Sequence, residues 1–437
     1  MQDLIRKKIV DSLAAPLPEF TRRDIRLPSV RGKAAAVIGM RRTGKTTFLW
    51  QVISDRLTQG TAREGLLYFS LEDERLAGIT GRELGVLVEE YYRLYPEWRD
   101  HRRAVFLLDE IQNAADWESF ARRLLDTERI ELFLSGSSAR LLSREVATSM
   151  RGRAMEVLVH PFSFREYLRH CGREPKREAE RLPKADRSAL DKALREYLIE
   201  GGFPEAQGLN VRDRFELLRS YVDVALLRDV VERYGVSQPV ALRWMARHLL
   251  DNPAGSFSVN KFHKDLKSQG ISIGKDTLHS YLAWLEDAFM IRTVSIASRS
   301  ERRRMVNPRK AYPVDPGLIP VFDRSGEPNL GHALETCVFL ELERRGAEIS
   351  YVRTQEGFEV DFLARYPDGR RELLQVCADP DSPSTLEREV RALMQARKEH
   401  PRAGLNLIVL RSETVGKPPR RVKLHWAPAW LLSREPR

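Results

Sequence analysis

The sequence predicts an α/β protein whose N-terminal part is built on a parallel sheet. Strand and helix patterns alternate from about residue 30 to about residue 160, and this alternation is typical of a parallel sheet covered by helices. The apolar runs that we assign to the strands are continuous, as expected for strands buried on both faces. These runs occupy residues 34–38, 66–69, 104–108 and 131–134.

The first run leads into a glycine-rich segment, Gly39-Met40-Arg41-Arg42-Thr43-Gly44-Lys45-Thr46. It matches the phosphate-binding pattern G-x-x-x-x-G-K-[ST] in its required place between a strand and a helix. The glycines let backbone N–H groups point at a polyphosphate, Lys45 supplies a cation for the β- and γ-phosphates, and the Thr46 hydroxyl can ligate Mg²⁺. We therefore predict a site for ATP or GTP with Mg²⁺. Its residues are Gly39, Arg41, Arg42, Thr43, Gly44, Lys45, Thr46 and Thr47.

Acidic residues follow the strand at residues 104–108. We predict that Asp109 holds the Mg²⁺ shell together with Thr46, and that Glu110 orients and deprotonates the attacking water. The strand at residues 131–134 leads into Ser135-Gly136-Ser137-Ser138, where a hydroxyl could contact the γ-phosphate or the water. We choose Ser137 as a catalytic residue beside Lys45 and Glu110, and a simple polar turn has equal weight.

Composition limits the class of protein and its partners. The 437 residues contain no apolar run as long as a membrane span and suffice for about two or three domains. The three cysteines are widely spaced and the N-terminus lacks the pattern of a signal peptide, so we expect a cytoplasmic protein with free thiols. A net charge of +11 and a pI near 9.6 indicate a polyanionic partner, above all nucleic acid, although an arginine-rich genome would give the same excess.

A second informative segment lies at residues 255–294. Residues 259–266 have the spacing of a short amphipathic helix, and residues 274–286 form a second helix with an apolar stripe. With a wing at residues 289–294, this order is typical of a winged helix-turn-helix. We predict DNA contact by the outer face of the second helix, with protein packing as the alternative. That face carries Lys275, Thr277, His279 and Ser280.

Basic residues cluster directly after this segment, at residues 299–304 and at Arg309-Lys310. A run of charges is usually a solvated loop, but beside a winged helix it can also contact DNA phosphates. Both interpretations remain open.

The C-terminal third has the layout of a restriction-type nuclease site, D…(E/Q)-x-K. Glu335 lies on a predicted helix, Asp361 on a strand, and Gln375 on the partner strand of a hairpin. In such a site acidic groups hold Mg²⁺ and a lysine acts on the water. Cys377 stands where that lysine is expected, so we predict that the domain binds DNA without cutting it and retains at most weak metal binding. The arginines available for phosphate contact are Arg365, Arg370 and Arg371.

Taken together, these segments resemble the prokaryotic family of AAA-type ATPases with an N-terminal P-loop domain, a winged helix and a C-terminal nuclease-like domain of unknown function. The resemblance covers nearly the whole chain and implies ATP hydrolysis. The family pattern usually ends its nuclease-like hairpin in E-V-K, from which residues 375–377 depart. The resemblance rests on GMRRTGKTT at 39–47, FLLDEIQ at 106–112, LSGSSARLL at 134–142, RGRAMEVLVHPFSFREYL at 151–168, GGFPEA at 201–206, YVDVALLRDVVERYG at 221–235, LETCVFLEL and EVDFLA.

We expect four parts along the chain: an ATPase domain at residues 1–165, a helical lid or linker region at 166–250, the winged helix at 251–300, and an inactive nuclease-like domain at 301–437. Within the second part, residues 172–196 are polar and charged. We interpret them as a surface linker that leads into an exposed helix.

The resemblance also implies a contact between subunits. AAA-type ATPases commonly act as rings in which an arginine of one subunit reaches the γ-phosphate of the next. We choose Arg153 for this role and Arg151 as the reserve, and a structural ion pair is an equal alternative. Two functions follow: a homo-oligomeric motor or remodeller on duplex or branched DNA, for example a hexameric ring, or a nucleotide-dependent switch that binds protein partners.

Overall fold

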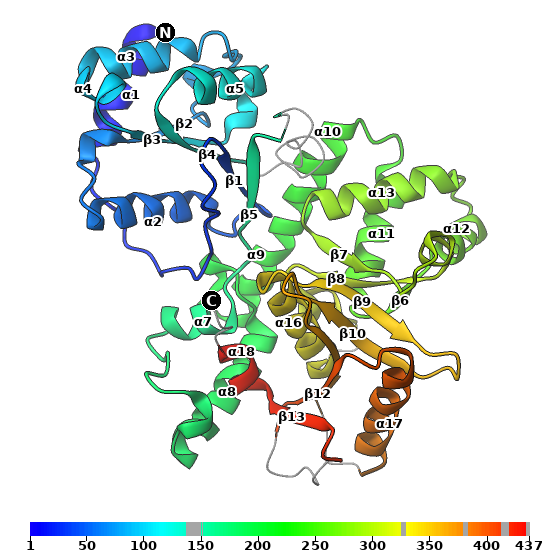
Figure 1. The fold of residues 1–437 in the computed structure, drawn as a ribbon. Helices are drawn as coiled ribbons and strands as arrows, with labels where there is room; N and C mark the ends of the chain where they lie inside the picture. The colour runs from blue at the N-terminus through cyan, green and yellow to red at the C-terminus, as the bar shows by residue number, and fades with distance from the viewer. Residues whose placement is uncertain (137–149, 151, 325–328, 379–382, 412–418, 434–437) are drawn as a thin grey trace. The chain divides into compact units, whose positions relative to one another are not determined.

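The computed structural model describes residues 1–136, 150, 152–324, 329–378, 383–411 and 419–433 (Figure 1). The chain divides into two compact units, residues 1–160 and 161–437. None of the helices within the described ranges has the length and apolar character needed to cross a membrane.

Unit 1 is built on a five-stranded sheet with the order β2-β3-β4-β1-β5, and all four strand pairs are parallel. The order places β4 between β1 and β3. Because these three strands are parallel, the loops that follow them all start at the carboxyl ends of the strands, on the same side of the sheet. Helix α2 (Lys45–Thr58) packs on one face through Phe48 and Val52, while α1 (Gln2–Ala14) packs against β2 and α3 (Gly85–Leu94). The strands are β1 (Ala34–Ile38), β2 (Leu66–Ser70), β3 (Ala104–Asp109), β4 (Ile130–Ser135) and β5 (Ala154–Leu158).

The parallel sheet predicted from the sequence is confirmed, and each predicted apolar run lies within a strand. Strand β5 was not predicted. Among the described strands it pairs only with β1, as the outermost strand of the sheet, and Glu156 in its middle is exposed. An edge strand of this kind lacks the continuous apolar run by which the other strands were recognised.

Unit 2 begins with a helical region. Helix α8 overturns the expectation of an exposed helix after a linker, because Leu194, Tyr197 and Leu198 are buried in the core of the unit. The apolar stripe of α8 is narrow, and the opposite face carries many charged residues, so the sequence as a whole indicates an exposed helix. The helices are α7 (Phe164–His170), α8 (Lys184–Glu200), α9 (Val211–Val224), η7 (Ala225–Val231), α10 (Glu232–Tyr234) and α11 (Pro239–Asp251).

The next part of unit 2 has the arrangement of a winged helix. Helices α12 (Val259–Ser268) and α13 (Lys275–Asp287) precede an antiparallel hairpin of β7 (Ile291–Val294) and β8 (Arg309–Pro313). A short strand, β6 (Ser256–Phe257), adds to β8. The boundary expected at residue 300 therefore falls inside the hairpin, whose tip carries the exposed helix α14 (Glu301–Val306).

The C-terminal part of unit 2 contains a mixed sheet with the order β13-β12-β11-β10-β9. Strands β9 to β11 are antiparallel and β11 to β13 are parallel. Helix α16 (Leu330–Arg344) packs on one face and α17 (Pro383–Glu399) on the other, because successive residues of the strands point to opposite faces. The strands are β9 (Glu348–Arg353), β10 (Glu359–Arg365), β11 (Arg371–Cys377), β12 (Gly404–Val409) and β13 (Val422–Trp426).

Candidate nucleotide-binding site

The segment between β1 and α2 forms a tight loop that depends on its glycines. Gly39 and Gly44 have φ angles of 148° and 93°. A Cβ atom at position 39 would lie 2.3 Å from the Val159 carbonyl oxygen, so only glycine fits there. Gly44 is the N-cap of α2, whose first N–H groups have no acceptor within the helix. The loop thus has the shape and the polarity to surround a phosphate group.

Lys45 curls back over this loop. Its Nζ donates to the carbonyl oxygens of Gly39 at 3.0 Å and Met40 at 2.9 Å, and the side chain is buried. Thr43 Oγ1 also donates to the Met40 carbonyl, at 3.0 Å. The ammonium therefore lies at the start of the loop, where it can attract an incoming phosphate.

Asp109, at the end of β3, is buried and accepts hydrogen bonds from three hydroxyls. Thr46 Oγ1 and Tyr68 Oη each donate to Asp109 Oδ2 at 2.8 Å, and Ser135 Oγ donates to Oδ1. Burial raises the pKa of Tyr68 well above its ordinary value, and the charge of Asp109 adds to this, so the phenol remains a donor. Thr46 and Asp109, the two predicted Mg²⁺ ligands, are thus brought together from α2 and β3.

Glu110 follows Asp109 but leaves the strand. Its backbone is left-handed, with φ 52° and ψ 46°, and its side chain is half-buried. The Gln112 side-chain amide donates to Glu110 Oε2. A left-handed conformation is unfavourable for a residue other than glycine, and such residues concentrate at functional sites. Strand β3 therefore ends at Asp109, and Glu110 begins the turn that follows.

The hydroxyl predicted at the end of β4 can be followed only in part. Ser137 lies outside the described residues. Ser135, the last residue of β4, is fully buried and contacts Asp109. The sequence predicts a polar residue at the end of this strand. It does not show that Ser135, the first serine after the apolar run, contacts the carboxylate of Asp109.

Arg23 is a residue of this site that the sequence did not reveal. Its Nη1 donates to the Thr43 carbonyl at 2.9 Å, and its Nη2 donates to the His160 carbonyl. Its backbone N–H donates to Gln51 Oε1 of α2 at 2.7 Å. Arg23 lies in a segment without helix or strand, so no periodicity could mark it. The guanidinium joins the phosphate loop to the end of unit 1.

Arg153 lies at the other end of β1. Its carbonyl oxygen accepts the N–H of Ala34, the first residue of β1, at 2.8 Å, whereas the phosphate loop follows the last residue of that strand. The side chain is partly exposed and pairs with Asp126. Arg153 therefore lies at the amino end of β1, whereas the phosphate loop of the same chain lies at the carboxyl end of that strand. Arg151 lies outside the described residues.

The residues of α13 that we predict to contact DNA differ in their exposure. Lys275 and His279 are exposed, whereas Thr277 and Ser280 are half-buried. Of the basic run that follows, the residues on α14 are mostly exposed. In the C-terminal domain Arg370 pairs with Asp368 at 2.6 Å and Arg365 with Glu348 at 3.8 Å. Arg371 is exposed.

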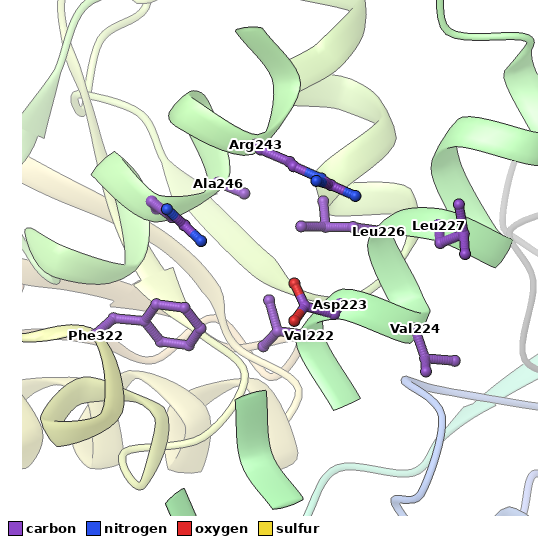
Figure 2. A pocket seen from close by; sticks show the side chains of 9 residues that line it. Val222, Asp223, Val224, Leu226, Leu227, Arg243, Ala246 and Phe322 are labelled. Atoms are coloured by element: carbon purple, nitrogen blue, oxygen red, sulfur yellow. The ribbon is translucent and has the colours of Figure 1, made fainter. Parts of the chain in front are cut away.

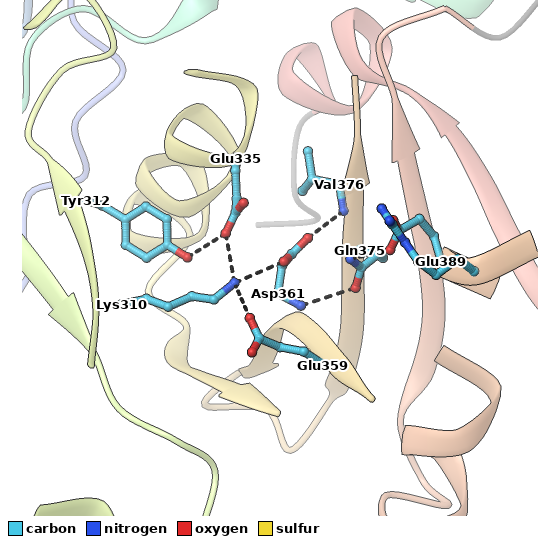
Figure 3. A network of polar contacts seen from close by, with 9 residues as sticks. Lys310, Tyr312, Glu335, Glu359, Asp361, Gln375, Val376 and Glu389 are labelled. Carbon is cyan, nitrogen blue, oxygen red and sulfur yellow. Dashed lines mark hydrogen bonds and ion pairs between the residues drawn. The ribbon is translucent and has the colours of Figure 1, made fainter. Parts of the chain in front are cut away.

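Two expectations about lysine in unit 2 are wrong. Lys310 is neither a solvated nor a phosphate-facing residue, because it is buried on β8. The nuclease-like site does contain an ammonium: Lys310 lies between Glu335 and Asp361, although Cys377 does not supply it (Figure 3). The family pattern has its lysine on the β10–β11 hairpin, whereas Lys310 belongs to β8.

Unit 2 also contains a pocket of about 330 Å³, lined by residues of α9, η7, α11 and α15 (Leu318–Phe322) (Figure 2). Asp223 and Arg243 contribute charges, while Val222, Leu226 and Phe322 provide apolar walls. The lining contains no residue of the phosphate loop. We therefore assign the nucleotide to the loop from its geometry and not to this pocket.

The chain is similar over nearly its whole length to an archaeal protein. It is 32% identical over 413 residues to an uncharacterized protein of Methanocaldococcus jannaschii, a match that covers 93% of this chain and 88% of the relative. An uncharacterized protein of Haemophilus influenzae is 28% identical over 333 residues, covering 76% of this chain and 79% of that one. A family of AAA domains matches residues 31–168, and a domain of unknown function matches residues 191–327.

Solved structures show only a distant likeness. The Walker-type ATPase of Pyrococcus abyssi gives a TM-score of 0.41 at 15% identity, covering 74% of this chain and 95% of that one. The ORC1 protein of Aeropyrum pernix, solved in complex with DNA, gives 0.27 at 14% identity, covering 74% and 90%. We draw no conclusion about function from scores of this size. The phosphate loop, the matched AAA domain and the archaeal relative together establish that this chain belongs to the prokaryotic family of P-loop AAA-type ATPases.

Proposed function

We propose that this protein hydrolyses ATP in a Mg²⁺-dependent reaction and uses that reaction to move along or remodel DNA. The observation that carries the proposal is the contact between Thr46 and Asp109, whose oxygens lie 2.8 Å apart beside the phosphate loop. A hydroxyl and a carboxylate are the ligand types that Mg²⁺ prefers, and Mg²⁺ bound there would neutralise phosphate charge. The left-handed Gly39 and Gly44 and the ammonium of Lys45 fit the nucleotide.

The remaining roles follow from position. Lys45 exchanges its two loop carbonyls for phosphate oxygens. Glu110 accepts the proton of the attacking water, because it directly follows Asp109 and its side chain is only half-buried. Arg153 acts on the nucleotide of a neighbouring subunit, since it lies at the edge of its own sheet opposite the phosphate loop. This assignment makes the active protein a homo-oligomer, for example a hexameric ring.

Contact with DNA is assigned to the winged helix. The outer side of α13 presents Lys275 and His279, and the tip of the hairpin presents the exposed Arg302 and Arg303 on α14. These side chains can reach phosphates without displacing other parts of unit 2. The chain's net charge of +11 supports a polyanionic partner.

The test is the ATPase rate of the purified protein with and without single-stranded, duplex and branched DNA, in a series of salt concentrations. We expect DNA to raise the rate several-fold and salt to reverse the increase. Replacing Arg302 and Arg303 by serine should remove the stimulation and leave the basal rate unchanged. The matched control replaces Arg181 and Arg212, which are exposed elsewhere in unit 2. Slow hydrolysis that is indifferent to every DNA would favour the nucleotide-dependent switch.

We further propose that the C-terminal domain binds DNA without cutting it. Arg371 is exposed at the start of β11, at the hairpin where phosphate contact was predicted. The check is a long incubation with linear, nicked and branched DNA in Mg²⁺ or Mn²⁺. Cleavage that disappears in Asp361→Ala would contradict this proposal and indicate a nuclease.

A further inference from the structure

Lys310 lies at the centre of a group of carboxylates in unit 2, of which Glu335 and Asp361 are largely buried and Glu359 is exposed (Figure 3). Its Nζ is 3.2 Å from Glu335 Oε1, 3.0 Å from Glu359 Oε1 and 3.1 Å from Asp361 Oδ1. The side chain is 5% exposed. An ammonium has three hydrogens, and three carboxylates surround this one.

Several other polar atoms of the nuclease-like site are also engaged. Asp361 Oδ2 accepts the Val376 N–H at 3.0 Å. Gln375 Oε1 accepts the Asp361 N–H at 3.2 Å, and Gln375 Nε2 donates to Glu389 at 2.8 Å. Tyr312 Oη donates to Glu335 Oε1 at 2.8 Å. The side chains that a nuclease would offer to a metal are therefore held in an internal network.

This arrangement does not fit the Mg²⁺ that the resemblance to nucleases implies. Mg²⁺ lies about 2.1 Å from its oxygen ligands, so an ion bound to Glu335 Oε1 and Asp361 Oδ1 would overlap the Lys310 ammonium. Three carboxylates hold the Lys310 ammonium at 3.0 to 3.2 Å, and this ammonium would repel a second cation.

Lys310 also differs from the lysine of a cleaving site. That lysine belongs to the strand of the hairpin, here β11, whereas Lys310 comes from β8 of the winged-helix sheet. Its hydrogens point at carboxylates, so none is directed at a water or a phosphate. The same strand contributes Tyr312 to the network. Two backbone hydrogen bonds join the segment after β7 to β9. The Ala297 N–H donates to the Tyr351 carbonyl at 2.7 Å, and the Tyr351 N–H donates to the Ser295 carbonyl at 3.1 Å.

We propose that Lys310 takes the place of the divalent metal in the nuclease-like domain, and that this internal cation fastens the β7–β8 wing to the C-terminal sheet. The domain is then independent of Mg²⁺, and the wing and the sheet move as one body. The inference does not rest on the proposed ATPase, because it concerns nucleotide-free protein and residues of unit 2 alone.

The test is Mn²⁺ binding to the full-length, nucleotide-free protein, followed by electron paramagnetic resonance. We expect no Mn²⁺ at this site in the wild type and a gain of one equivalent in Lys310→Met. The gain should be lost again in Lys310→Met/Asp361→Asn, which separates it from any ion at the phosphate loop. Lys423→Met, at an exposed position on β13, is the matched control and should gain nothing.

Two results would overturn the inference. One is a wild-type Mn²⁺ signal that Asp361→Asn removes. The other is a folded Lys310→Met protein that binds no additional Mn²⁺. If Lys310→Met does not fold, the comparison of wild type with Asp361→Asn still decides, and Lys310→Arg should fold and remain without Mn²⁺.

Discussion

Thr46 Oγ1 donates a hydrogen bond of 2.8 Å to Asp109 Oδ2. Thr46 belongs to the first turn of α2 and Asp109 to the last position of β3, and β4 lies between β3 and the strand that precedes α2. Tyr68 from β2 and Ser135 from β4 donate to the same carboxylate. The group that would hold Mg²⁺ is therefore also a polar centre that joins three neighbouring strands to a helix.

Substitutions in this site should separate nucleotide binding from chemistry. Lys45→Ala removes the loop's ammonium and should abolish ATP binding, measured by titration calorimetry. Glu110→Gln keeps the shape of the side chain but cannot accept a proton, so it should retain ATP affinity and lose turnover by about 10²-fold or more. Hydrolysis by Glu110→Gln at the wild-type rate would mean that another group is the base.

Arg23→Ala should weaken nucleotide binding although Arg23 is not part of the loop. Without the guanidinium the carbonyls of Thr43 and His160 lose a donor, and the loop is held less firmly. We expect the Kd for ATP to rise about tenfold, which corresponds to the loss of about 1.4 kcal/mol. The neighbouring Arg22→Ala, which breaks a surface pair with Asp55, is the control and should bind ATP normally. Equal effects of the two substitutions would exclude a specific role for Arg23.

Arg153→Ala should leave ATP affinity near normal and sharply reduce turnover if Arg153 acts in trans. Mixing it with Glu110→Gln should restore activity, because some interfaces then combine an intact Glu110 with an intact Arg153. Asp126→Ala breaks the same surface ion pair but keeps the arginine, so it should hydrolyse ATP at a near-normal rate. No recovery in co-assembled mixtures, shown by sedimentation, would count against the finger.

Lys310→Met should destabilise unit 2 more than the removal of a surface lysine does. Deleting one partner of a buried ion pair leaves uncompensated charge on Asp361, and such losses cost about 3–5 kcal/mol. Lys310→Arg keeps the charge and should lose clearly less. Denaturant unfolding of both variants, with Lys423→Met as reference, measures the difference. A Lys310→Met protein as stable as the wild type would show that the network contributes little.

Asp315 should give unit 2 a stability that falls as the pH rises. Its carboxylate accepts the N–H groups of Gly202 at 2.7 Å and Gly317 at 2.9 Å, and burial raises its pKa from 3.8 to about 7. The folded protein therefore binds a proton that the unfolded chain releases between about pH 4 and pH 7, so the contribution is complete below pH 4 and is lost through pH 7.

Asp315→Asn should remove this slope from a plot of melting temperature against pH. Asp368→Asn is a control of opposite sign, because the Arg370 side chain lowers the pKa of the exposed Asp368 and that contribution is lost as the pH falls. An unchanged slope in Asp315→Asn would mean that Asp315 stays ionised when folded.

The sequence predicted those parts of the site that follow one another along the chain. The loop from Gly39 to Thr46 and the acidic pair at the end of β3 are local patterns, and the parallel sheet brings such strand ends to one edge. Arg23 and Lys310 could not be predicted in the same way. The partners of each residue lie far from it in the sequence. Neither residue lies in a segment whose periodicity indicates a buried position. Arg23 is in an irregular segment and Lys310 ends a run of charges.

Lys310 also affects how the C-terminal domain could change during evolution. Restoring a lysine at position 377 would not by itself recover a cleaving site, because the acidic residues would still surround the Lys310 ammonium. Removing Lys310 first would destabilise the unit before any catalytic benefit arose. Two substitutions must therefore occur nearly together, and each is harmful or silent alone. Such mutual dependence would make the exchange of the internal cation Lys310 for a cleaving site difficult in evolution.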